Sequence, residues 1–295
     1  MIDLKDLQFL VALARHRHFA RAAGECGVSQ PAFSMRIKAL EEKLNTTIVK
    51  RGNRFQGLTG EGEAILRRAR YILDEVRELE QEARAATGDV AGRVSIGVVP
   101  TAAVFAGHLA TELHSAHPGI VATIETASSL AIQQGIELGR YDAGLTYSDG
   151  VSHDILQVEP LYDETYALLL TRELAAGRSE IGWREAAELP LSLLEPGMQN
   201  RRILDRAFDD AGAVPNVVAE SSGHLAALAM VVSGRAATVV PEVLVSTLGQ
   251  IAGLVALPLV EPSLAKSISL VAANRGPGRA TIDALFRVAR VISRD

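Results

Sequence analysis

Hydroxyl and amide side chains stand at the expected starts of several helices in the second part of the chain. The first turn of a helix has free backbone N–H groups and the positive end of the helix dipole, which together favour an anion. Several such helix starts that meet in one cleft predict a site for a small anionic or polar molecule. The alternative is that each side chain only caps its own helix. The residues predicted to bind this molecule are Thr101, Ser128, Ser129, Gln199, Ser221 and Ser222.

Residue patterns of catalytic and metal sites are absent from the sequence. It contains no GxSxG, GxxxxGK[ST], HExxH or GxGxxG motif. Among the scattered histidines, His114 and His117 have a spacing that suits one helix face, but no third ligand lies nearby. Cys26 is the single cysteine, which excludes a disulfide framework and a cysteine-based zinc site. These observations predict no enzyme activity, no cofactor and no metal.

A second group of polar side chains follows Ser29, which is expected to cap a helix that has Pro31 in its first turn. The apolar stripe of this helix is Phe33, Ile37, Leu40 and Leu44, and its opposite face carries Gln30, Ser34, Arg36 and Lys38. Gln can pair with adenine and Arg with guanine in the major groove of DNA. A shorter helix and a Gly-Val turn precede this segment, so the pattern predicts a helix-turn-helix.

Two short β-prone runs, 47–49 and 55–58, flank a basic turn and predict a wing whose Arg51 and Arg54 contact phosphates. Residues 1–60 hold ten Lys/Arg and five Asp/Glu, a net charge of +5. Residues 61–88 hold five and seven, which gives −2, and the remainder holds fifteen and twenty-three, which gives −8. A basic head on an acidic body indicates that the head meets a polyanion, although such an asymmetry also arises by chance.

Residues 61–88 have a sustained heptad pattern, with polar and charged residues between the apolar positions. A lone helix of this kind would leave its stripe in water, so the pattern predicts a dimer. The alternative is that the helix packs on its own chain. The residues predicted at the dimer interface are Ile65, Ala69, Ile72, Val76 and Leu79.

From residue 93 onward, β-prone and helical segments alternate, which predicts an α/β unit with a largely parallel sheet. The segments 125–140 and 220–235 resemble each other, which indicates two subdomains built alike. The expected domains are a helix-turn-helix unit at 1–60, a linker helix at 61–88 and an effector unit at 89–295. Within the last, subdomain I takes about 89–162 plus 267–295, and subdomain II takes about 163–266.

Residues 19–23, 28–34 and 37–41, followed by Leu58-Thr59 and Gly62-Glu63, resemble the N-terminal region of LysR-type transcriptional regulators. The resemblance implies a winged helix-turn-helix, a long linker helix and a two-subdomain effector domain similar to periplasmic binding proteins. It also implies a homodimer, commonly assembled into a tetramer, on dyad-symmetric promoter DNA, with a small-molecule coinducer. Carried over by position, Gln30, Pro31, Ser34, Arg36 and Lys38 would face the major groove. Met35 departs from the family, which commonly has a basic residue there.

The function predicted from these observations is a sequence-specific DNA-binding transcriptional regulator tuned by a small effector. The N-terminus lacks a secretory signal and no apolar run is long enough to cross a bilayer, which predicts a cytoplasmic protein without membrane contact. A different class of protein remains as the alternative, a small-molecule-binding or enzymatic α/β protein with an incidental helical head. A structural chromatin protein is the third option, but it would leave the acidic body without a role.

Overall fold

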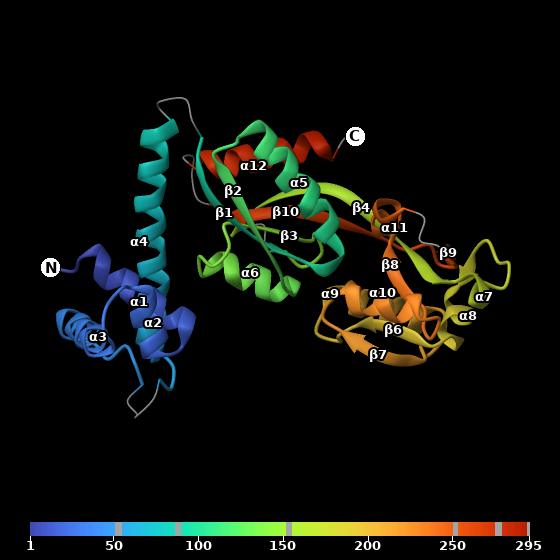
Figure 1. Ribbon diagram of the computed structural model, residues 1–295, viewed down its shortest axis with the longest axis horizontal. Coiled ribbons are helices and arrows are strands. Elements are labelled where there is room, and N and C mark those ends of the chain that lie inside the picture. Colours follow the sequence, from blue (N-terminus) through green and yellow to red (C-terminus); the bar gives the residue numbers. More distant parts are fainter. Residues whose placement is uncertain (51–54, 86–89, 152–154, 250–252, 275–278, 294–295) are drawn as a thin grey trace. The chain divides into compact units, whose positions relative to one another are not determined.

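The computed structural model describes residues 1–50, 55–85, 90–151, 155–249, 253–274 and 279–293. The chain divides into two compact units, Met1–Gly88 and Asp89–Asp295 (Figure 1). The first unit is helical, and the second combines strands and helices. Arg51 and Arg54, predicted on the wing, lie outside the described residues.

The first unit is built from four helices: α1 (Leu4–His16), α2 (Phe19–Glu25), α3 (Gln30–Leu44) and α4 (Gly60–Ala85). Local signals set their ends. The Asp3 carboxylate accepts a hydrogen bond from the Asp6 N–H at the start of α1, and the Ser29 hydroxyl accepts one from the Ala32 N–H at the start of α3. Gly27, with φ 65°, makes the turn between α2 and α3. These helices therefore form the predicted helix-turn-helix.

The core of the first unit is the apolar stripe of α3 packed against α1 and α2. Phe33, Ile37 and Leu40 are buried, and the Phe33 ring stacks on the Phe9 ring with centroids 4.9 Å apart. The predicted two-stranded wing is reduced, within the described residues, to one antiparallel bridge between Val49 and Leu58. The β-prone runs are thus brought together as predicted, but they pair too briefly to form strands.

The second unit contains an eight-stranded sheet, a separate two-stranded sheet and covering helices (Figure 1). The strands are β1 (Gly92–Val98), β2 (Ile120–Thr126), β3 (Ala143–Tyr147), β4 (Leu156–Thr171), β5 (Ile181–Gly182), β6 (Leu191–Leu194), β7 (Val217–Ser221), β8 (Thr238–Pro241), β9 (Leu254–Val260) and β10 (Ala265–Ala273). The helices are the 3₁₀ turn η1 (Pro100–Ala102), α5 (Ala103–Ala116), α6 (Ser129–Glu137), α7 (Arg172–Ala175), α8 (Trp183–Glu188), α9 (Gln199–Asp210), α10 (His224–Val232), α11 (Glu242–Leu248) and α12 (Ala280–Ile292).

The prediction of a largely parallel sheet was wrong. β1 pairs with β2 and β3 in parallel, but β10 is antiparallel to both β3 and β4, and β4 is antiparallel to β8 and β9. The reason is that β4 and β10 run beside each other in opposite directions across the unit. The expected subdomain boundaries, at about 162–163 and 266–267, lie in these two strands.

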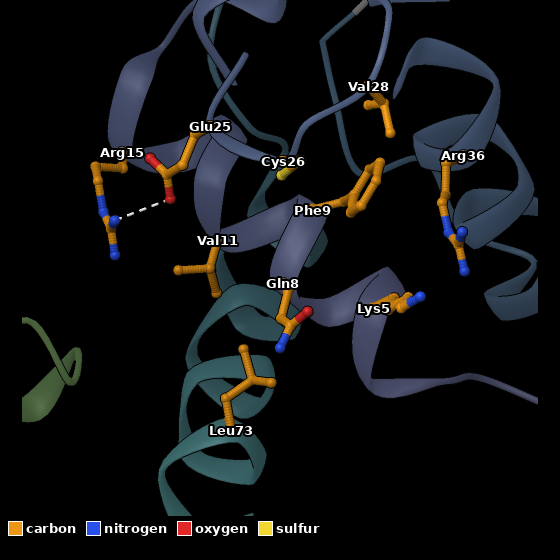
Figure 2. A pocket seen from close by; sticks show the side chains of 10 residues that line it. All are labelled: Lys5, Gln8, Phe9, Val11, Arg15, Glu25, Cys26, Val28, Arg36 and Leu73. Atoms are coloured by element: carbon orange, nitrogen blue, oxygen red, sulfur yellow. Dashed lines mark hydrogen bonds and ion pairs between the residues drawn. The ribbon is translucent and has the colours of Figure 1, made fainter. Parts of the chain in front are cut away.

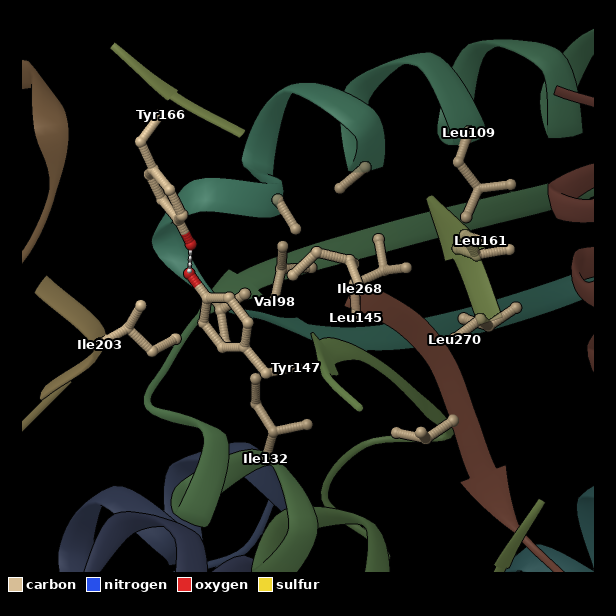
Figure 3. Packing of buried hydrophobic residues seen from close by; sticks show 14 of the residues in the cluster. Val98, Leu109, Ile132, Leu145, Tyr147, Leu161, Tyr166, Ile203, Ile268 and Leu270 are labelled. Carbon is tan, nitrogen blue, oxygen red and sulfur yellow. Dashed lines mark hydrogen bonds between the residues drawn. The ribbon is translucent and has the colours of Figure 1, made fainter. Parts of the chain in front are cut away.

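Two lobes result, joined by β4 and β10. In the first lobe α5 and α12 lie together on one face of the sheet and α6 lies on the other (Figure 1). Its core includes Leu109, Leu145 and Leu270 (Figure 3). The second lobe contains β6, β7 and β8 with α8, α9 and α10, and there the Trp183 ring meets the Phe208 ring edge to face at 5.1 Å. In each lobe the parallel strands end where helices begin, and the predicted effector residues lie at these ends.

Candidate functional site

The outward face of α3 is a row of exposed side chains. Gln30, Pro31 and Lys38 are exposed as predicted, and Ser34 is half-buried. Met35 lies between Pro31 and Lys38 on this face and is 69% exposed. Residues 31, 35 and 38 have the spacing of one helix face, so Met35 lies on the surface with Pro31 and Lys38. The sequence prediction assigned only polar residues and Pro31 to this face and left Met35 out. A helix with such a face fits the major groove, and an apolar side chain can contact the thymine methyl group.

Arg36 is held by acidic residues of α1, and it does not fit its predicted role of reading guanine. Its Nε donates to Asp6 Oδ1 at 3.0 Å, and its Nη2 donates to Asp3 Oδ2 at 2.9 Å. Its guanidinium also lies over the Phe9 ring, 5.2 Å from the centroid. The hydrogen bond to Asp6 raises the pKa of Arg36 further. These contacts favour a structural role for Arg36, as a tie between α1 and α3.

Asp6 is the buried centre of this tie, with only 1% of its surface exposed. Lys43 Nζ donates to its second oxygen, Oδ2, at 2.6 Å. Burial alone would raise the pKa of Asp6, but the hydrogen bonds from Lys43 and Arg36 lower it overall. Asp6 therefore fixes how α3 is presented, although it does not itself lie on the exposed face of α3.

The segment after α3 is fastened to the helix and to the start of α4. The Glu41 carboxylate accepts hydrogen bonds from the backbone N–H groups of Ile48 and Val49 at 2.7 and 2.9 Å. The Thr59 hydroxyl donates to the Thr47 carbonyl at 2.6 Å. At Gly62 a Cβ atom would lie 2.2 Å from the Ile48 carbonyl oxygen, so only glycine fits. These contacts attach residues 47–49 to α3 and to the start of α4, and Lys50, which follows them, is exposed.

One part of the apolar surface of α4 packs on its own unit, and another part does not. Leu66, Ala69 and Leu73 pack into the core of the first unit with Leu10, and Ile65 is partly buried against the same cluster. Ala69 is only 1% exposed because it packs on its own chain, which does not favour its predicted place in a dimer interface. The other predicted interface residues, Ile72, Val76 and Leu79, do not join this core and form the open stripe of α4.

Leu79 is 66% exposed, Ile72 is exposed and Val76 is half-buried. Beside this open stripe, Leu73 lines a hollow of about 490 Å³ together with α1 residues that include Gln8 and Val11 (Figure 2).

The predicted effector residues of the second unit have different local roles. The Thr101 hydroxyl is buried 3.0 Å from the Tyr147 hydroxyl, and Ser128 caps α6 by accepting from the Ala131 N–H. Ser129 is buried and its Oγ has no hydrogen-bond partner among the described residues.

In the second lobe, Gln199 accepts from Arg202 at 2.6 Å. The Ser221 hydroxyl donates to the Gly223 carbonyl at 2.8 Å, and Ser222 is exposed. Thr101 and Ser129 are therefore the buried members of the predicted set.

The Tyr147 hydroxyl is the point where both lobes meet. It donates to Glu164 Oε1 at 2.9 Å and lies 3.4 Å from the Tyr166 hydroxyl (Figure 3). Asn200 Nδ2, from the first turn of α9 in the second lobe, donates to it at 3.5 Å. Ile132 of α6 and Ile203 of α9 belong to the same buried cluster as Tyr147 (Figure 3).

The sequence interpretation missed Tyr147, Glu164 and Tyr166, because their pairing depends on how distant strands lie together.

Burial dominates the electrostatics of this cluster. It raises the pKa of Glu164 to about 7, although hydrogen bonds from Tyr166, Tyr147 and Thr101 oppose the shift. It also raises the pKa of Tyr147 and lowers the pKa of His224, at the start of α10, to about 4. Tyr147 and His224 are therefore uncharged in neutral solution, whereas Glu164 is largely protonated only in slightly acidic solution.

Arg201, two residues after Gln199, binds acidic side chains of its own lobe. Its Nε donates to Asp205 at 2.8 Å, and its Nη1 donates to Glu220 at 2.7 Å and to the Leu194 carbonyl at 3.0 Å. An anionic ligand would have to compete with two carboxylates for this guanidinium.

Within the described ranges, no group of three or more His, Cys, Asp or Glu side chains is arranged to hold a metal ion. No helix in that part of the chain is long and apolar enough to span a membrane.

Comparisons with known proteins cover both units. Residues 4–63 match the family of bacterial regulatory helix-turn-helix proteins of the lysR type, and residues 87–291 match the LysR substrate binding domain. The DNA-binding transcriptional dual regulator OxyR of Escherichia coli is 29% identical over 294 residues, which are 98% of this chain and 95% of that protein.

Two further comparisons agree. A hydrogen peroxide-inducible genes activator of Pectobacterium carotovorum subsp. carotovorum is 28% identical over 289 residues, 96% of this chain and 94% of its own. The solved structure of a full-length OxyR variant from Pseudomonas aeruginosa matches with a TM-score of 0.77 and 25% identity, and covers 99% of this chain and 95% of that chain. The helical head is thus a regular part of such proteins, which removes the support for an incidental head on an α/β protein.

Proposed function

The chain belongs to the LysR family of bacterial transcriptional regulators, and from that premise we propose how its residues bind DNA, pair two copies and sense an effector. It is a DNA-binding transcriptional regulator with an effector-binding domain. We propose that it acts without catalysis and in the cytoplasm, where promoter DNA is found.

The DNA contact is assigned to the exposed face of α3. Gln30, Pro31, Ser34 and Lys38 would face the major groove, where Gln30 would contact a base. Lys38 would contact a phosphate at the edge of the groove, and Ser29 at the helix start would also lie close to the phosphates. Met35 would add an apolar contact at the centre of this face. Arg51 and Arg54 would contact the backbone from the wing. The observation that carries this assignment is the capped helix whose one face is buried and whose other face is exposed and polar apart from Met35.

The pairing of two copies is assigned to the open part of α4. Ile72, Val76 and Leu79 keep the heptad spacing but do not join the core of the first unit, and two of them are exposed. An exposed apolar stripe of this kind favours a second helix. Pairing through these residues would place two α3 helices about a twofold axis, which suits dyad-symmetric promoter DNA. We expect two dimers to assemble into a tetramer, as is common in the family.

The effector is proposed to bind reversibly in the second unit. Residues 89–295 contain no cysteine, and Cys26 lies in the helical head. Thiol oxidation therefore offers no signal in the second unit, although one relative is a hydrogen peroxide-inducible genes activator. The buried cluster of Thr101, Tyr147 and Asn200 between the lobes supports a small polar molecule there. Such a molecule would act by binding one arrangement of the lobes more tightly than another.

The DNA assignment predicts two kinds of variant. Gln30→Ala should weaken binding to the preferred DNA site by about 1–3 kcal/mol with little effect on random DNA, because a base contact is lost. Lys38→Ala should weaken binding to both DNAs alike and flatten the salt dependence, because a phosphate contact is lost. Mobility shifts with DNA of equal length at several salt concentrations measure both.

Gln157→Ala, at an exposed position of the second unit, is the matched control and should bind as the wild type does. Equal losses on both DNAs for Gln30→Ala and Lys38→Ala would refute the division between base and phosphate contacts.

A further inference from the structure

Glu164 is a buried carboxylate with one unpaired oxygen. It lies on β4, the strand that passes from one lobe to the other, and is 2% exposed. Its Oε1 accepts the Tyr147 hydroxyl proton, whereas its Oε2 has no hydrogen-bond partner among the described residues. A buried acceptor without a donor is unfavourable by several kcal/mol at most and is rare in folded proteins. The site therefore calls for a group that donates a hydrogen bond.

Asn200 brings a second unpaired acceptor from the other lobe. The Tyr147 hydroxyl has one proton, which it donates to Glu164, so its oxygen accepts from the Asn200 amide. This fixes the orientation of the amide and leaves Asn200 Oδ1 without a partner in the described structure. Glu164 and Asn200 thus hold the same hydroxyl, and each offers one free oxygen.

Two cations that are neighbours of Glu164 in the sheet or of Asn200 in the chain are bound elsewhere. Lys266 stands opposite Glu164 in the register of β10 and β4, but its ammonium group binds Asp149 at 2.8 Å. Arg201, which follows Asn200, is held by Asp205 and Glu220. Neither side chain supplies the missing donor to Glu164.

The titratable groups that face Glu164 do not balance its charge. Tyr147 of β3 and Tyr162 and Tyr166 of β4 stay neutral, because burial raises the pKa of each hydroxyl. Thr101, the remaining hydrogen-bonding neighbour, has no charge. When Glu164 is ionised, it therefore places an unbalanced negative charge between the lobes.

We propose that the effector is a small organic cation whose ammonium group binds Glu164 Oε2 and Asn200 Oδ1. An ammonium group has three donors and no acceptor, which suits two unpaired oxygens, and its charge balances the carboxylate. A carboxylate ligand would meet a like charge at this point. The inference rests on the proposal that the second unit binds an effector, and it reverses the anionic preference expected from the helix starts alone.

The test uses the full-length protein in phosphate buffer at pH 8, which contains no competing amine. The probes are ammonium chloride, ethylamine, 1,4-diaminobutane and agmatine, compared at constant ionic strength with acetate, propionate and succinate. Trp183, the single tryptophan, lies in the second lobe and reports the thermal unfolding of that unit by fluorescence. At least one amine should raise the unfolding temperature, and none of the carboxylates should. Calorimetric titration then gives the affinity of that amine.

Variants locate the binding group. Glu164→Gln keeps the size of the side chain but removes its charge, and it should weaken amine binding at least tenfold. Asn200→Ala removes the second acceptor and should also weaken amine binding. Glu173→Gln, exposed on α7, is the matched control and should bind the amine as the wild type does.

Three outcomes overturn the inference: stabilisation by carboxylates, amine binding unchanged in Glu164→Gln, or no stabilisation by any amine. A mobility shift on the same preparation separates this failure from a broader one. If the protein retains DNA but binds no amine, only the ligand class is wrong. If it does not retain DNA, the proposed regulator itself is wrong.

Discussion

Replacing Asp6 with alanine should lower the free energy of unfolding of the first unit by about 3–5 kcal/mol, because the two charge-assisted hydrogen bonds that its buried carboxylate accepts are lost. Asp6 is buried, and both of its carboxylate oxygens bind side chains of α3, Arg36 and Lys43. Such a loss is a large part of the stability of a small unit. DNA binding should fall with it, since α3 would lose its attachment to α1.

The measurement is urea unfolding followed by two signals. Circular dichroism reports the helices of both units, whereas fluorescence of Trp183 reports the second unit alone. Asp6→Ala should shift the circular dichroism transition of the first unit by roughly 1–3 M urea and leave the fluorescence transition in place. Glu42→Ala is the matched control, because Glu42 is exposed and 3.9 Å from Lys38, and it should cost less than about 1 kcal/mol. Equal effects of the two substitutions would show that Asp6 is not the tie between α1 and α3.

The second unit should become less stable as the pH rises, because of Glu164. Burial raises its pKa from the model-compound value of 4.5 to about 7. Between these values the folded protein binds more protons than the unfolded chain, so the free energy of unfolding falls with rising pH. The contribution is present in full below pH 4.5 and is lost through pH 7, and it amounts to about 3 kcal/mol.

Comparison of wild type with Glu164→Gln isolates this effect from other titrating groups. Unfolding followed by Trp183 fluorescence from pH 4.5 to 8 should show the wild type losing about 3 kcal/mol relative to the variant. Glu173→Gln should follow the wild type at every pH. A constant difference between wild type and Glu164→Gln across this range would mean that Glu164 does not titrate near neutral pH in the folded protein.

Local patterns predicted the helical head well, because its signals are short in sequence. The Ser29 cap, the stripe of Phe33, Ile37 and Leu40, and the Gly27 turn each act within a few residues. The exposed positions of α3 follow from the same periodicity. The contacts of Arg36 with α1 were not predicted, because its partners, Asp3 and Asp6, are about thirty residues away in the chain.

Interactions between distant segments account for the other differences between the predictions and the structure. The heptad spacing is the same at the buried Ala69 and at the exposed Ile72 and Leu79. Spacing alone therefore does not reveal that Ala69 packs on its own unit. Alternating strands and helices predicted the α/β class, but the antiparallel pairing arises because β4 and β10 cross between lobes. The Tyr147 cluster combines residues 17 to 53 positions apart in the chain, which no local pattern contains.

The central claim is that two copies pair through α4 and read a twofold site with their α3 helices. Selection of bound sequences from random double-stranded DNA by the full-length protein tests it most directly. The account predicts two inverted copies of one motif whose centres lie one helical turn, about 34 Å, or a multiple of it apart. Leu79→Glu, which places a charge in the open stripe of α4, should lose the paired motif. Enrichment of a single unpaired motif by the wild type, or of no motif, would contradict the claim.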